Sequence, residues 1–122
     1  MPKKTTSNPT SLIAFEQQHI RRAWHNDEWW FAVSDVVEVL SESSNVTDYI
    51  KKMRSRDSEL SKGWGQIVTP LSIATSGGKQ KVNCANTKGI LRIIQSIPSR
   101  KAEPFKQWLA QVGYERIQEI EN

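Results

Sequence analysis

PLSIATSGGKQKVNCANTKGILRII, residues 70–94, decides the fold, because its apolar residues change from a period of two to the period of a helix. Apolar residues alternate on both sides of Gly77 and Gly78, and glycine supplies the positive φ that a tight hairpin turn demands. The segment TKGILRII then predicts a helix capped by Asn86 or Thr87. The stretch therefore predicts a β-hairpin that leads directly into a helix.

The expected hairpin register has both glycines in the turn and places Ala74 opposite Lys81. Because alternate side chains of a strand point to opposite sides, Val82 is predicted to face the core. Lys79 and Lys81, followed by Asn83, are predicted to point together to the other side, away from the core.

A second hairpin is predicted upstream. HIRRAWH (19–25) and EWWFAVS (28–34) are rich in aromatic residues and flank Asn26 and Asp27, a pair that tolerates positive φ. The two-residue turn would set Trp24 opposite Trp29. Ser34 is the expected N-cap of a short helix that follows.

Further helices are predicted on both sides of residues 70–94. Asn45 or Thr47 can cap a basic helix, and the SKGWG segment (61–65) after it is expected to be a loop. In the helix at 87–94, Leu91 is expected to face inward. A last helix is expected to begin around residues 102–104, with an inward line of Phe105, Trp108, Leu109 and Val112.

The length of 122 residues suits one domain. We expect an α+β fold, with two antiparallel hairpins packed with about four helices. Residues 1–14 are expected to be a flexible tail, 15–118 the domain, and 119–122 the start of a linker to a further C-terminal region. The sequence does not indicate an oligomeric state.

Neither a membrane span nor a signal peptide is predicted, because the longest apolar runs are short, so a cytoplasmic location is expected. No cofactor, metal site or catalytic group is expected either. His19 and His25 lie about 20 Å apart if they share one strand. The single Cys84 is expected to be a buried strand thiol, and Asp57 with Glu59 a pair of solvated carboxylates.

Charge is distributed unevenly. The net charge is +4, yet residues 61–102 contain seven Lys or Arg and no Asp or Glu. A contiguous basic segment attracts polyanions, which favours a nucleic-acid partner, although solvated surface charge is the ordinary alternative. The candidate contacts fall into three groups: Lys79, Lys81 and Asn83, with Ser72, on the hairpin; Lys51, Lys52, Arg54 and Arg56 on the basic helix; and Lys88, Arg92, Arg100 and Lys101 around the next helix.

These groups differ in what they can contact. Lysine favours point contact with phosphate, whereas Arg54, Arg56 or Arg92 can bind guanine bidentately. The four basic residues of the second helix cannot all lie on one side. Trp64 has two interpretations, a platform on which an unpaired base stacks or a side chain packed under the hairpin.

Three segments together resemble a known family. WFAVSDVVEVL (30–40), GGKQKVNCANTKGILRII (77–94) and FKQWL (105–109) are similar, in this order, to the Bro-N domain. That domain is the N-terminal module of baculovirus BRO proteins and of many phage and prophage antirepressors. The resemblance covers roughly residues 15–118, and departs from the family pattern at LSESSNVTDYI (40–50) and SIPSRKAEP (96–104).

The resemblance implies a non-enzymatic regulatory module that binds DNA, which we expect to be double-stranded. It also implies a role in transcription regulation, in phage induction or in a DNA-damage response. A module that binds another regulatory protein without contacting DNA is the alternative.

Overall fold

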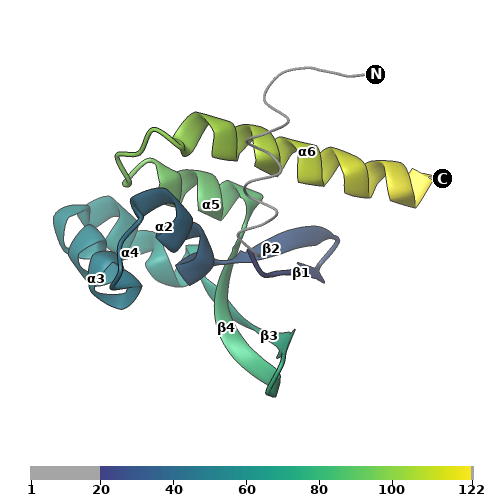
Figure 1. Ribbon diagram of the computed structural model, residues 1–122, viewed down its shortest axis with the longest axis horizontal. Helices are drawn as coiled ribbons and strands as arrows, with labels where there is room; N and C mark the ends of the chain where they lie inside the picture. The colour runs from purple at the N-terminus through teal and green to yellow at the C-terminus, as the bar shows by residue number, and fades with distance from the viewer. Residues whose placement is uncertain (1–19, 122) are drawn as a thin grey trace.

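A computed structural model describes residues 20–121, with side chains described for residues 20–113. The expected tail at 1–14 and His19 lie outside the described residues. The described chain is a small α+β domain, in which five helices pack with one curled four-stranded antiparallel sheet of order β1-β2-β4-β3 (Figure 1). The elements are β1 (Arg22–His25), β2 (Glu28–Ala32), α2 (Val33–Ser41), α3 (Val46–Arg56), α4 (Ser58–Ile67), β3 (Thr69–Thr75), β4 (Gly78–Asn86), α5 (Thr87–Ile94) and α6 (Ala102–Glu121).

Both predicted hairpins form, and β2 pairs with β4 to join them into the sheet. The first hairpin has the expected turn, since Asn26 and Asp27 have φ values of 52° and 60°. Trp24 lies opposite Trp29, and their rings meet edge to face with centroids 5.2 Å apart. Such cross-strand aromatic pairs stabilise the sheet.

The predicted register of the second hairpin is wrong by two residues. Ala74 lies opposite Lys79 rather than Lys81, because the turn is made by Ser76 and Gly77. Gly78, with a φ of 102°, follows that turn instead of forming part of it. A shift of two residues leaves every side chain on its predicted face, since the period of a strand is two. Lys79 and Lys81 therefore do share the exposed face, as predicted.

The expected loop at residues 61–65 is in fact helical and belongs to α4. Asp57 caps this helix, because its side chain accepts a hydrogen bond from Leu60 N at 3.0 Å. Leu60, Trp64 and Ile67 then follow helical spacing and pack on or against the core. This packing outweighs the low helix propensity of the two glycines that flank Trp64.

Two local predictions fail at helices α2 and α5. Helix α2 begins at Val33 without a side-chain cap, so Ser34 lies in its first turn and is not the N-cap. Asn86 caps helix α5. Leu91 of this helix was expected to face inward but is 36% exposed, and Ile93 is buried instead.

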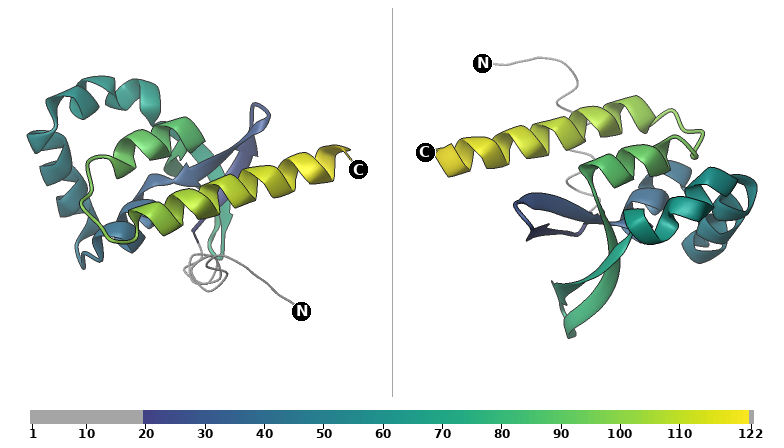
Figure 2. Two further views of the ribbon diagram at one scale, coloured as in Figure 1. Left: turned by 90° about the horizontal axis from the view of Figure 1, so that it is seen from above. Right: turned by 180° about the vertical axis from the view of Figure 1, so that it is seen from behind.

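The core lies between the sheet and the helices, and all five helices, α2 to α6, contribute buried side chains to it. Phe105, Trp108, Leu109 and Val112 of α6 are all buried, as predicted, and the Trp108 ring contacts that of Phe31 on β2 with centroids 5.7 Å apart. The β3–β4 hairpin projects from the body on the side away from α6 (Figures 1 and 2). Its tip is therefore free of the helical layer.

Candidate nucleic-acid interface

One face of the projecting hairpin carries the first group of predicted contacts. Lys79, Lys81 and Asn83 are all exposed and alternate along β4, with Ser72 directly opposite Lys81. Alternate residues of a strand are about 6.6 Å apart, so the row spans about 13 Å. Within the described residues, neither lysine makes an ion pair. We call this row the hairpin face.

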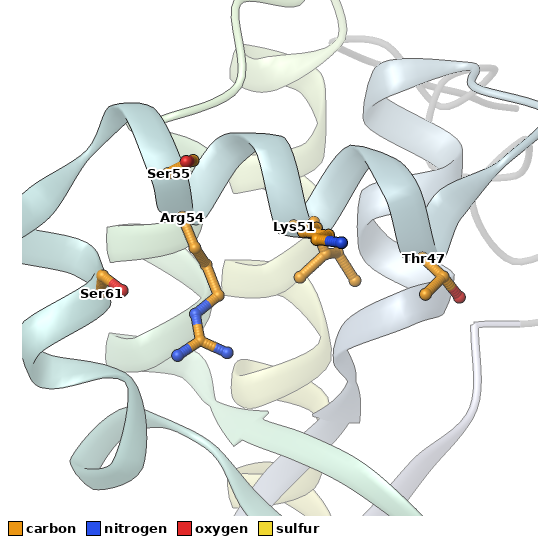
Figure 3. A pocket seen from close by; sticks show the side chains of 6 residues that line it. Thr47, Lys51, Arg54, Ser55 and Ser61 are labelled. Carbon is orange, nitrogen blue, oxygen red and sulfur yellow. The ribbon is translucent and has the colours of Figure 1, made fainter.

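The hairpin face leads into a hollow between α2, α3, α4 and β4. One part of it, of about 300 Å³, is lined by Ser34, Thr47, Arg54, Trp64 and Asn83, over Val33 and Ile50. A second part, of about 430 Å³, shares Thr47, Ile50 and Arg54 and is completed by Lys51, Ser55 and Ser61. Figure 3 shows Thr47, Lys51 and Arg54 projecting from one side of α3 toward this space. We call the two parts together the α3 pocket, and Asn83 belongs both to it and to the hairpin face.

The four basic residues of α3 diverge, as predicted. Lys51 and Arg54 line the α3 pocket, whereas Lys52 pairs with Asp48 at 3.1 Å. Arg56 donates to the backbone oxygen of Ser96 at 2.9 Å. Only one side of the helix thus contributes cations to the pocket.

The cations around α5 also differ in whether they form ion pairs within the domain. Lys88 and Arg100 are exposed. Lys101 forms an ion pair with Glu42 at 2.8 Å, and this contact lowers the pKa of that carboxyl. Arg92 is half-buried and donates to both carboxylate oxygens of Asp57 at 3.1 Å. The guanidinium of Arg92 is therefore committed to an intramolecular contact.

Asp57 is not the solvated carboxylate that the sequence predicts, because its side chain accepts several intramolecular hydrogen bonds. It accepts hydrogen bonds from the Ser96 hydroxyl, from Leu60 N and from Arg92. The Ser96 hydrogen bond is the largest cause that lowers its pKa, which is about 2. The sequence does contain a signal for this role, because an Asp three residues before Leu60 can cap a helix by accepting a hydrogen bond from the Leu60 backbone N–H. The other two partners, Arg92 and Ser96, lie 35 and 39 residues away in the sequence, so no local sequence pattern indicates these contacts.

Trp64 is half-buried against the core, and the Arg54 guanidinium lies over its ring, 4.6 Å from the centroid. Because Arg54 covers one face of the indole, that face is not open to a nucleic-acid base. Trp64 therefore packs against the core, and it does so from a helix rather than from the expected loop.

Within residues 20–113, no group of three His, Cys, Asp or Glu side chains is placed to hold a metal ion. Cys84 is buried, as predicted, and burial raises the pKa of its thiol. No helix in the described part of the chain has the length and apolar character needed to cross a membrane.

Comparison with known proteins identifies the family. No curated protein and no solved structure shows significant similarity to the chain. The family model for the BRO family N-terminal domain, Bro-N, matches residues 19–115. This match includes both hairpins, α2 to α5 and the part of α6 that packs on the core. The chain therefore belongs to the BRO family and carries its N-terminal domain.

Proposed function

We propose that this Bro-N domain is a DNA-binding regulatory module that contacts the phosphate backbone through the hairpin face and the rim of the α3 pocket. The family supplies the regulatory, antirepressor-like class. The direct contact with DNA and the surface that makes it are our inference from charge and geometry.

The single observation that carries the proposal is the position of Asn83. It ends the row of Lys79 and Lys81 on β4 and also lines the pocket that holds Lys51 and Arg54. Two basic groups that are far apart in the sequence thus become one surface. The basic segment 61–102 contributes no carboxylate to this surface, so the lysines retain their full charge toward a polyanion.

Several of the other candidate cations already have partners within the domain, which reduces the number of residues that we expect to contact DNA. Arg92, Lys101, Lys52 and Arg56 hold partners within the domain, so a move to DNA would break those contacts. Lys88 and Arg100 are exposed and stay secondary candidates. Lys51, Arg54, Lys79, Lys81 and Asn83 form the primary set.

The shape of the surface favours double-stranded DNA. The major groove admits a two-stranded β-ribbon, and β3 with β4 is such a ribbon, projecting clear of α6 (Figure 1). Lysines on one face of the ribbon can then bind phosphates at the edge of the groove.

A titration of labelled DNA across a salt series tests this proposal. The duplex, its single strand and an unrelated duplex are each titrated, starting at about 50 mM salt. Duplex affinity is expected to fall steeply as salt rises, because phosphate contacts release counterions. An absence of binding at low salt, or an affinity insensitive to salt, contradicts the proposal. A domain that binds no DNA but still captures another regulator would instead be the protein-binding type of antirepressor.

A further inference from the structure

The Arg54 guanidinium has no hydrogen-bond acceptor among the described residues, unlike the guanidinium groups of Arg21, Arg56 and Arg92. Arg21 donates to Asp35 and Arg92 to Asp57, each at about 3 Å. Within the described residues, the Arg54 guanidinium makes no hydrogen bond or ion pair, and its Nε is both buried and without a partner. A buried donor without an acceptor destabilises the folded state, and more so when the donor is charged. An unused guanidinium at this position therefore points to an acceptor from outside the domain.

Stacking on Trp64 fixes the guanidinium in place. The indole lies 4.6 Å from the guanidinium carbon, within the range of a cation–π contact. Because the side chain is already ordered by this contact, it loses little conformational entropy when an acceptor binds. The flexible, exposed Lys79 and Lys81 have no such support.

The surroundings of Arg54 suit an anion. Besides Arg54, the polar groups of the α3 pocket are the Lys51 ammonium, the hydroxyls of Ser34, Thr47, Ser55 and Ser61, and the amide of Asn83. None of the lining residues is a carboxylate. The smaller part alone, of about 300 Å³, has the volume of roughly ten waters of liquid. A phosphate group with part of its hydration shell fits this space.

We propose that the α3 pocket seats one phosphate of the bound DNA backbone, with Arg54, stacked on Trp64, as its fixed donor. This inference rests on the proposed function. The row from Lys79 to Asn83 spans about 13 Å, which corresponds to about four nucleotides at 3.4 Å of axial rise per strand. One strand of the duplex would run along the hairpin face and end its contact in the pocket. Such a seated phosphate sets the register of the DNA on the protein.

Arg54→Ala, Arg54→Lys and the control Lys52→Ala test the pocket by DNA affinity. Lys52 lies on the same helix but outside the pocket lining, so it controls for the loss of one charge. Arg54→Ala is expected to weaken binding roughly tenfold to hundredfold, because a charge-assisted hydrogen bond contributes about 1.5–3 kcal/mol. Lys52→Ala is expected to change affinity less than threefold. Arg54→Lys is expected to keep the salt slope and lose at least threefold in affinity, because lysine lacks the planar fork that stacks on Trp64.

If Arg54→Ala binds DNA as tightly as Lys52→Ala, or if Arg54→Lys restores full affinity, the proposal is overturned while the DNA-binding function stands. A second measurement tests the anion pocket independently of DNA binding. The domain labelled with 5-fluorotryptophan is titrated with inorganic phosphate, and the fluorine signal assigned through Trp64→Phe is expected to shift in the wild type and not in Arg54→Ala. A wild type that binds no DNA but shows this shift would keep the anion pocket and refute the proposed function. An unmoved Trp64 signal, with phosphate and with DNA, overturns the pocket proposal.

Discussion

Removal of both lysines from the hairpin face should reduce DNA affinity by an amount that depends on salt. Lys79 and Lys81 are exposed, lie on one face of β4 and make no ion pair within the described residues. Each phosphate contact contributes about 0.9 to the slope of log affinity against log salt, so Lys79→Ala with Lys81→Ala should reduce the slope by about 1.8. At 0.1 M salt, relative to 1 M, this amounts to a loss of about 60-fold.

Fluorescence anisotropy with a labelled duplex, repeated at four or five salt concentrations, measures this slope directly. The matched control is Lys62→Ala with Lys106→Ala, which removes the same charge from lysines paired with Glu59 and Glu103 at 3.6 and 3.1 Å. The control should keep most of the wild-type slope. If both double variants lose the same slope, only net charge matters and the hairpin face is not the contact. Equal losses for unrelated duplexes are expected, because phosphate contacts are independent of sequence.

Further predictions concern stability. Gly89→Ala should lower the melting temperature by several degrees, because the added Cβ would meet Ile67 Cγ2 at 2.8 Å and Ala85 Cβ at 3.1 Å, and overpacking of about 1–3 kcal/mol exceeds the gain in helix propensity; an unchanged melting curve would contradict this close approach. Asp57→Asn should destabilise the domain above about pH 4 and progressively less toward pH 2, because the folded state lowers the pKa of this carboxyl from 3.8 to about 2 and its ionised form stabilises the fold; circular dichroism melts at pH 2 to 7 test this, and a deficit independent of pH would contradict it. Cys84 should react with iodoacetamide far more slowly than a free thiol until the domain is unfolded, since it is buried; a rate equal to that of the unfolded chain would show that the strand opens readily.

Strand pairing was predictable wherever local chemistry determines it. The Asn26 and Asp27 turn sets the first hairpin, because few residue pairs tolerate positive φ at both positions. In the second hairpin three candidate turn residues follow one another, so the sequence did not distinguish a turn at Gly77 and Gly78 from one at Ser76 and Gly77. Lys79 and Lys81 were nevertheless predicted on the correct face, because the two registers differ by two residues and side chains alternate with a period of two.

Neither helix α4 nor the intramolecular contacts of the arginines could be predicted, because both depend on contacts between residues far apart in the sequence. Two glycines in the segment 61–65 locally disfavour a helix, and the contacts of Trp64 and Leu60 with the core, which outweigh them, are tertiary. The contact of Arg92 with Asp57 spans 35 residues, so composition alone presented Arg92 as a free cation. Sequence charge therefore located the basic segment, and only the structure separates its available cations from the committed ones.

We expect DNA to lie along the hairpin face and in the α3 pocket. Amide chemical-shift mapping of the labelled domain, titrated with a short duplex at low salt, tests it most directly. We expect the outer side of α6 to be unaffected and the largest shifts to fall on residues of β4 and α3, namely Lys79, Lys81 and Asn83, and Lys51 and Arg54. Shifts concentrated on α6, with β4 and α3 unperturbed, would contradict it.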